Sequence, residues 1–236
     1  VTSAAVTALT SGSTINTSAD ITGTVTLTAA ADNEVVTSSG AATSYVVTSA
    51  GTLTNVTLSS TSTAATKFDT DADGVVTLTS AGDMTIDAVA ATTVVATSSK
   101  AIVDVTTDDL DAATSVTLTA GDEIVATIDA ATTATLSSGS TTTDSVIDSG
   151  GSLTSLSLSG NGAATDFNVT GANNLAAVTI TGDQSVTVIA SAADIDALTA
   201  GTGNIFTVTD TGSAGTSTLQ VGTAAGDMDL SGSTVD

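Results

Sequence analysis

Aliphatic and hydroxyl-bearing residues alternate in short segments along the whole chain. Seven segments place aliphatic side chains on one face and Thr or Ser on the other: 24–28, 56–58, 75–79, 116–119, 156–158, 178–181 and 206–208. A period of two residues is typical of a half-buried β-strand. Helical periodicity is absent except at residues 192–198, where one helical turn is expected, and Thr, Ser, Val and Gly are poor helix formers. The pattern predicts an all-β chain with little helix.

The strand-like segments also repeat. Gly-Asp pairs at 82–83, 121–122, 182–183 and 226–227 are separated by 39, 61 and 44 residues, close to two, three and two units of roughly 20 residues. Segments 166–169 and 185–188 supply a second short strand within a unit. We therefore predict a parallel β-solenoid (β-helix) of roughly 12 coils, in which a second or third strand follows the first in place of a helix.

The alternation also predicts which side chains fill the core. One set of aliphatic residues is expected to point inward, with the interleaved Thr and Ser pointing outward: Val76, Leu78, Val116, Leu118, Leu156, Leu158, Val178 and Ile180. The whole chain, residues 1–236, is expected to form a single elongated repetitive domain with a weak division near residues 100–110.

Composition favours this narrow core over a thicker one. Hydrophobic residues make up 41% of the chain, but there are only three Phe and one Tyr. A solenoid can be filled by Val, Ile, Leu and Ala in repeating layers. Tandem β-sandwich domains are the alternative fold, although such domains usually require a bulkier aromatic core.

The charge and the missing residue types limit the function. The chain has 25 acidic residues, two lysines and no His, Cys, Arg or Pro, which gives a net charge of −23. Nucleic acid is not an expected partner because basic groups that neutralise phosphates are lacking, and no apolar run is long enough for membrane insertion. Catalytic Ser–His–Asp or Cys–His groups cannot be formed. We expect a protein that is not an enzyme.

One acidic motif predicts a metal site. The segment 69–74 reads DTDADG, so that Asp69, Asp71 and Asp73 alternate before Gly74. This is the first half of a calcium-binding loop, in which carboxylates converge because glycine permits a sharp turn. The twelfth position is Ser80 rather than Glu, so Asp83 or Asp87 is expected to complete the coordination. Ca²⁺ is the predicted cofactor, and a solvated acidic turn neutralised by Lys67 is the alternative.

Three further segments carry a family resemblance: LTSLSLSG at 153–160, LAAVTITGD at 175–183 and ATTATLSSG at 131–139. They resemble the lattice-forming region of bacterial surface-layer (S-layer) proteins of the RTX, type-I-secreted kind, which share the excess of Thr, Ala, Val and Gly. The calcium-binding nonapeptide of that family does not occur here. The resemblance implies an extracellular β-solenoid that assembles with copies of itself, with the family's secretion and calcium segment outside this chain.

We therefore expect a structural subunit of a self-assembling layer or filament on a prokaryotic cell surface. Its expected partners are copies of itself and cell-surface polysaccharide, with divalent ions reducing the repulsion between acidic surfaces. A stalk segment of a large secreted adhesin is the alternative function. Ice binding is a remote alternative, since Thr-x-Thr pairs recur along the chain, although their irregular spacing in the sequence argues against it.

Overall fold

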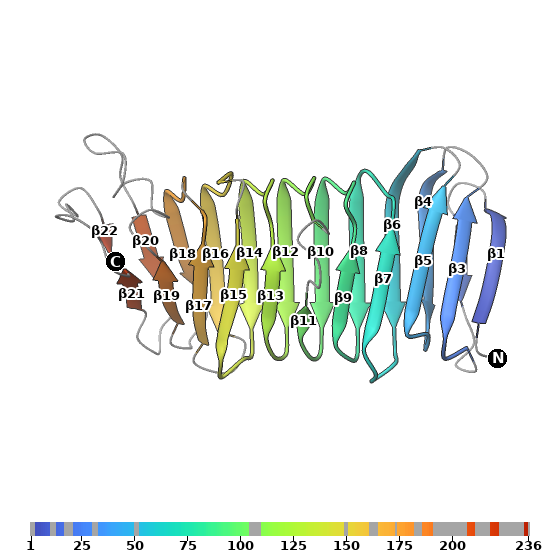
Figure 1. Cartoon of the computed structure of the whole chain (residues 1–236), viewed down its shortest axis with the longest axis horizontal. Helices are drawn as coiled ribbons and strands as arrows, with labels where there is room; N and C mark the ends of the chain where they lie inside the picture. The colour runs from blue at the N-terminus through green and yellow to red at the C-terminus, as the bar shows by residue number, and fades with distance from the viewer. Residues whose placement is uncertain are drawn as a thin grey trace. The chain divides into compact units, whose positions relative to one another are not determined.

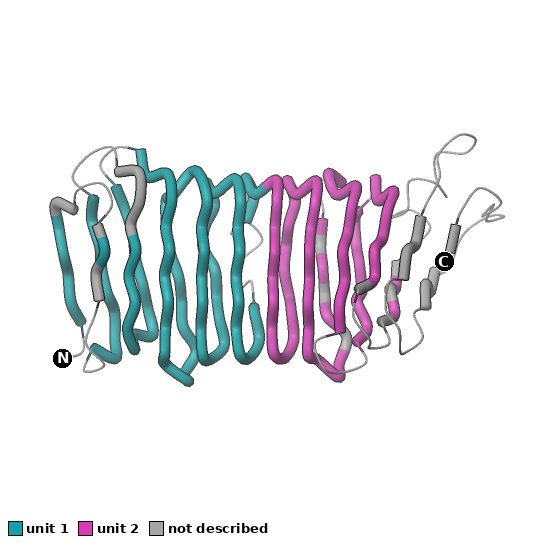
Figure 2. Tube along the Cα trace, turned by 180° about the vertical axis from the view of Figure 1, so that it is seen from behind, with its two compact units in different colours: residues 1–113 teal, residues 114–236 magenta. Residues whose placement is uncertain are grey.

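The computed structural model contains 22 β-strands and no helix among the residues that it describes. Those residues are 3–9, 13–16, 21–29, 33–49, 52–103, 110–148, 151–160, 165–172, 174–181, 186–190, 207–210, 218–221 and 234–235. The chain forms two compact units, Val1–Ala113 and Thr114–Asp236 (Figure 2). The helical turn predicted at residues 192–198 lies outside the described residues.

Unit 1 contains two parallel sheets (Figure 1). The odd-numbered strands pair in the order β1-β3-β5-β7-β9-β11 and the even-numbered strands in the order β2-β4-β6-β8-β10. Their bounds are β1 Ser3–Leu9, β2 Ser13–Asn16, β3 Thr24–Ala29, β4 Asn33–Gly40, β5 Ser44–Ser49, β6 Leu53–Ser60, β7 Thr66–Thr70, β8 Val75–Ser80, β9 Met84–Asp87, β10 Thr93–Ser98 and β11 Ile102–Val103.

Unit 2 repeats this arrangement, with the orders β13-β15-β17-β19-β21 and β12-β14-β16-β18-β20-β22. Its strands are β12 Ser115–Ala120, β13 Ile124–Thr127, β14 Thr133–Ser138, β15 Thr143–Ile147, β16 Ser155–Gly160, β17 Thr165–Thr170, β18 Ala177–Thr181, β19 Val186–Ala190, β20 Thr207–Asp210, β21 Thr218–Val221 and β22 Thr234–Val235. Each coil thus gives one strand to an odd sheet and one to an even sheet. The predicted parallel β-solenoid is confirmed, and the tandem-sandwich alternative is wrong, because sandwiches are built from antiparallel sheets.

Coil length follows from the strand register. Ser3 pairs with Thr24 and Thr24 pairs with Ser44, so each of these coils takes up about 20 residues, as the sequence repeat predicts. The coil is slightly shorter where Val75 pairs with Thr93 and considerably longer where Ala177 pairs with Thr207. The differences in length fall in the connections, because the strands must keep their register.

The predicted core register is confirmed. All eight aliphatic residues expected to point inward are at most 1% exposed. In the even sheet of unit 2, Leu136, Leu158 and Ile180 stack in adjacent coils. The interleaved Ser157 is not buried. In unit 1 the two large aromatic residues stack on each other, with the ring centroids of Tyr45 and Phe68 5.4 Å apart.

Serine residues form part of the interior where even strands lead into odd strands. Ser60, Ser98 and Ser138 end their strands and are at most 3% exposed. Each Oγ donates a hydrogen bond to a carbonyl of the preceding coil, at 2.7 to 2.8 Å. Each also accepts the backbone N–H two residues later in the chain. The hydroxyl therefore satisfies backbone groups that a buried corner would otherwise leave unpaired.

Several of the opposite corners, where odd strands lead into even strands, use a tight turn, in most cases with an apolar first residue. The N–H of Ala91 bonds to the carbonyl of Ala88, and the same spacing joins Ala131 to Ile128. The segments IDAVAATT at 86–93 and IDAATT at 128–133 carry this turn in the sequence. After the turn, Thr132 donates its hydroxyl proton to the carbonyl of Thr114 in the coil before it. The repeated turn thus links neighbouring coils through side chains as well as through the sheets.

Candidate functional site

The acidic motif spans the end of β7 and the turn that follows it. Asp69 lies within β7, between the buried side chains of Phe68 and Thr70, so its carboxylate points outward. Asp71 and Asp73 are exposed in the turn before β8. The predicted site therefore lies on the surface of unit 1, at an odd-to-even corner.

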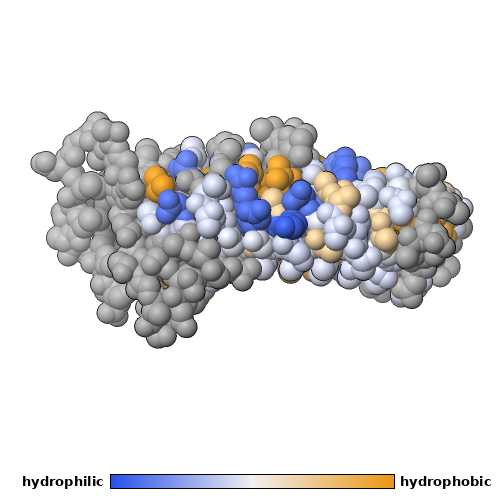
Figure 3. Space-filling model, turned by 90° about the horizontal axis from the view of Figure 1, so that it is seen from below, coloured by the Kyte–Doolittle hydropathy of each residue, from blue (hydrophilic) through white to orange (hydrophobic). Residues whose placement is uncertain are grey.

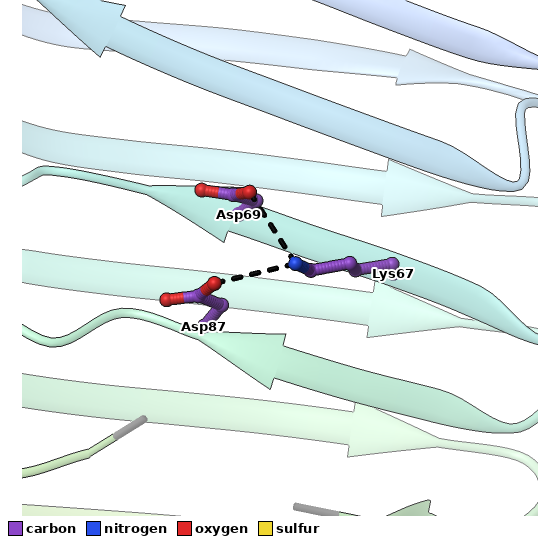
Figure 4. Close-up of polar contacts among 3 residues, drawn as sticks. All are labelled: Lys67, Asp69 and Asp87. Carbon is purple, nitrogen blue, oxygen red and sulfur yellow. Dashed lines mark hydrogen bonds and ion pairs between the residues drawn. The ribbon is translucent and has the colours of Figure 1, made fainter. Parts of the chain in front are cut away.

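Asp69 is paired with a lysine rather than with the other two aspartates of the motif. Lys67 Nζ lies 3.4 Å from Asp69 Oδ2 and 3.3 Å from Asp87 Oδ2, as Figure 4 shows. Asp69 and Asp87 are register partners on β7 and β9, so the lysine joins adjacent coils. Burial lowers the pKa of Lys67, but the hydrogen bond to Asp87 and the charges of Asp69 and Asp87 outweigh it and raise that pKa. The ammonium group therefore remains charged in this bridge.

Asp71 has a different role. Its Oδ2 accepts the backbone N–H of Ser49 from the preceding coil at 3.1 Å. The backbone N–H of Asp73 donates to the carbonyl of Leu53 at 2.9 Å, which fixes the turn against the same coil. Over the described part of the chain, no group of three or more acidic side chains is placed to hold a metal ion. The structure thus brings Asp69 together with Lys67 and Asp87, and does not bring Asp69, Asp71 and Asp73 together.

Gly74 has a packing role that the motif did not predict. A Cβ atom at this position would lie 2.3 Å from the backbone oxygen of Thr54 and 3.0 Å from its Cγ2. The described glycines with positive φ are Gly151 and Gly171, so Gly74 is required by close approach to the neighbouring coil rather than by a left-handed turn.

Calcium binding at this motif is tested by titrating the metal-free protein with Ca²⁺ in a calorimeter. If the turn closes around the ion, heat is expected for one site and is lost in Asp71→Ala, because that change removes one of three carboxylate ligands. Asp166→Ala, which removes an exposed acid from unit 2, is the control and should leave the heat unchanged. Calcium heat that is absent, or that is the same in Asp71→Ala, would refute the site.

A second candidate is the outward face of the even sheets. Thr57 is in register with Thr77 in unit 1, and Thr117, Thr135, Ser157 and Thr179 follow one another across four coils of unit 2. None of these side chains is buried. The hydroxyl residues that are irregularly spaced in the sequence are therefore regularly spaced on the surface, because variable connections absorb the differences in coil length.

The described surface is mostly polar. Figure 3 shows a face on which hydrophilic and near-neutral residues predominate, with smaller hydrophobic areas between them. Val75 and Val89 are the large hydrophobic side chains that are exposed in the described residues, at 41% and 45%. Two exposed valines are common on soluble proteins and do not by themselves define a binding patch.

Comparison of the chain with family models, with curated proteins and with solved structures gives no match in any of the three. The described residues include no helix with the length and apolar character needed to cross a membrane.

Proposed function

We propose that the chain is a non-enzymatic structural subunit of an extracellular layer or filament on a prokaryotic cell surface, similar to S-layer proteins. The observation that carries this proposal is the in-register stacking of outward hydroxyl residues over successive coils. A surface with the same chemistry at each coil offers the same contacts repeatedly, which is what association between copies of one chain requires.

The charge of the chain suggests how copies associate. A net charge of −23 opposes contact between copies unless counterions reduce the repulsion. Divalent cations that bridge surface carboxylates would do this more effectively than screening by monovalent salt. Cell-surface polysaccharide is the second partner in this proposal, since neutral sugars can exchange hydrogen bonds with rows of Thr and Ser hydroxyls.

Assembly is therefore expected to depend on divalent cations. In sedimentation measurements at low ionic strength, the full chain should pellet as large particles with millimolar Ca²⁺ and return to the supernatant on addition of a chelator. When monovalent salt is added in the presence of chelator, only part of the protein should return to the pellet. Particles that persist in chelator at low salt would argue against carboxylate bridging. A chain that stays in the supernatant under every condition would favour the adhesin-stalk alternative.

The strand register supports ice binding more strongly than the spacing of Thr residues in the sequence does. Outward Thr and Ser residues two positions apart on stacked strands form an array with spacings of about 6.7 Å along the strand and about 4.8 Å between coils. A flat array of hydroxyls can order surface water, so ice binding is the second candidate. Thermal hysteresis measured during freezing tests it, and a freezing point equal to the melting point would remove it.

A further inference from the structure

The coil around β15 carries two carboxyl groups in its interior. Asp144, Val146 and Asp148 alternate inward along this segment, and each is 0% exposed. Along the odd sheet, the register partner of Asp144 in the next coil is the buried Phe167. An ionisable side chain thus occupies a position that an apolar residue fills in the neighbouring coil, and an unpaired charge there would be strongly unfavourable.

Asp148 has donors that suit a charged carboxylate. It occupies the first position of an odd-to-even corner turn, where other corners have Ala88 or Ile128. Its Oδ2 accepts the backbone N–H of Leu153 at 2.7 Å, and the backbone N–H groups of Ser152 and Gly151 also stabilise the carboxylate, although its Oδ1 is buried without a hydrogen-bond partner. Burial raises the pKa of Asp148, while these three hydrogen bonds oppose the increase.

Asp144 has fewer donors. Its Oδ1 accepts the backbone N–H of Ile124 at 2.5 Å and lies 3.0 Å from the Oγ of Ser138. Its Oδ2 is buried and has no hydrogen-bond partner in the described structure. A carboxylate with one bare oxygen in an apolar core is much less stable than a neutral carboxylic acid, so this environment favours the protonated form.

The hydrogen bonding of Ser138 supports the same assignment. A hydroxyl has one proton, and Ser138 Oγ also lies 2.8 Å from the carbonyl oxygen of Asp122. At the equivalent corners, Ser60 and Ser98 donate to carbonyls at 2.7 Å. The single proton of Ser138 cannot be donated fully to both oxygens, so the Asp122 carbonyl competes with Asp144 for it and a charged Asp144 is poorly stabilised.

No basic group is available in unit 2 to pair with a charged Asp144, because both lysines of the chain precede residue 114. The ionisable groups near Asp144 are Asp122 and Glu123 before β13, Asp148 on its own segment and Asp166 on the outward face of β17, and β14 and β16 contain none. All of these groups are acidic. Burial and, to a smaller extent, the charges of Glu123 and Asp122 raise the pKa of Asp144 to about 6, although its two hydrogen bonds oppose the increase.

We propose that Asp144 is a proton-binding residue inside the coil around β15, and that this coil is more stable when Asp144 is protonated than when it is ionised. In the folded chain the pKa of Asp144 is about 6, whereas in the unfolded chain it has its ordinary value near 3.8. Between these values the folded state binds more protons, so a rise in pH favours unfolding. The unfolding equilibrium constant is expected to rise about 100-fold across that interval through this group alone.

The test uses urea unfolding of the full chain, followed by circular dichroism at pH 4 and pH 7.5. Asp144→Asn keeps the shape and removes the ionisable proton, and Asp166→Asn on the exposed face removes one acid as a control. In Asp166→Asn, the unfolding equilibrium constant should change with pH as it does in the wild type. In Asp144→Asn, the change in this constant between the two pH values should be smaller by a factor of about 100. An equal pH dependence in the two variants would overturn the proposal.

A second measurement keeps the proposal testable if Asp144→Asn does not fold. The side-chain carboxyl carbon of Asp144 in the wild-type protein can be titrated by ¹³C NMR, which reports protonation directly. A midpoint near pH 6 is expected, and a midpoint near pH 4 would overturn the proposal. Neither readout requires assembly, so failure here would leave the proposed structural function untouched, and failure of assembly would leave this inference untouched.

Discussion

Replacing Leu158 with Asp is expected to unfold the coils around β16. Leu158 is 0% exposed and stacks between Leu136 and Ile180 in the even sheet of unit 2. The change would place a carboxylate against apolar side chains on both sides, where no basic residue of this unit can pair with it. The expected loss in the free energy of unfolding is more than about 4 kcal/mol, which places this change among the most severe core substitutions.

Urea unfolding followed by circular dichroism measures this loss, with Ser157→Asp as the matched control. Ser157 is the preceding residue on the same strand and is not buried, so the same new charge would face solvent. Its effect should stay within about 0.5 kcal/mol, as is usual for surface substitutions. Equal losses in the two variants, or a greater loss for Ser157→Asp, would mean that the register of β16 is wrong.

Replacing Gly74 with Ala is expected to destabilise unit 1 by about 3 kcal/mol, the upper part of the range for overpacking. The new methyl group would lie 2.3 Å from the backbone oxygen of Thr54, and a backbone atom held in a sheet cannot move aside as a flexible side chain can. Asp73→Ala is the control, because the Asp73 side chain is exposed and its backbone hydrogen bond to Leu53 does not depend on the side chain.

This pair of variants also separates the two roles of the motif at residues 69–74. Thermal unfolding should be measured in chelator, where any calcium contribution is removed. The packing role predicts that Gly74→Ala is still less stable than the wild type and that Asp73→Ala is nearly unchanged. If Gly74→Ala matches the wild type in chelator and differs from it only with Ca²⁺, the glycine serves a metal loop instead.

Alternation and repeat length were sufficient to predict the solenoid. An aliphatic residue at every second position can be satisfied only by a strand with one buried face, and the regular recurrence of such segments implied stacked copies of that strand. The residues from Leu156 to Leu158 and from Val178 to Ile180 illustrate this, since their burial follows directly from the pattern. The division of each coil into two sheets was harder to predict, because segments such as 24–28 and 75–79 look alike although they belong to different sheets.

The corners were not predicted because their polar residues are common elsewhere in the chain. Ser138 resembles any of the 30 serines until the register shows it buried at a strand end. Asp144 was likewise not distinguished from surface aspartates, although the alternation of residues 144, 146 and 148 places it on the inward face with Val146. The Ala-Ala-Thr-Thr segments at 90–93 and 130–133, in which two of these turns end, were the available signal for the opposite corners.

The acidic motif illustrates the limit of short patterns. Asp69, Asp71 and Asp73 match the spacing of a calcium loop, but spacing in a sequence does not determine which way side chains point. A strand that continues through Thr70 turns Asp69 toward Lys67, and the next coil supplies Asp87 as the other partner of that lysine. The contact that decides this arrangement thus comes from a different coil, which a short motif does not include.

Electron microscopy of the purified full chain tests the proposed structural role most directly. The protein would be imaged with millimolar Ca²⁺ and again after addition of a chelator, at the same concentration and ionic strength. Ordered sheets or filaments are expected with calcium, and they should be lost in chelator. Dispersed single particles in both conditions would contradict self-assembly.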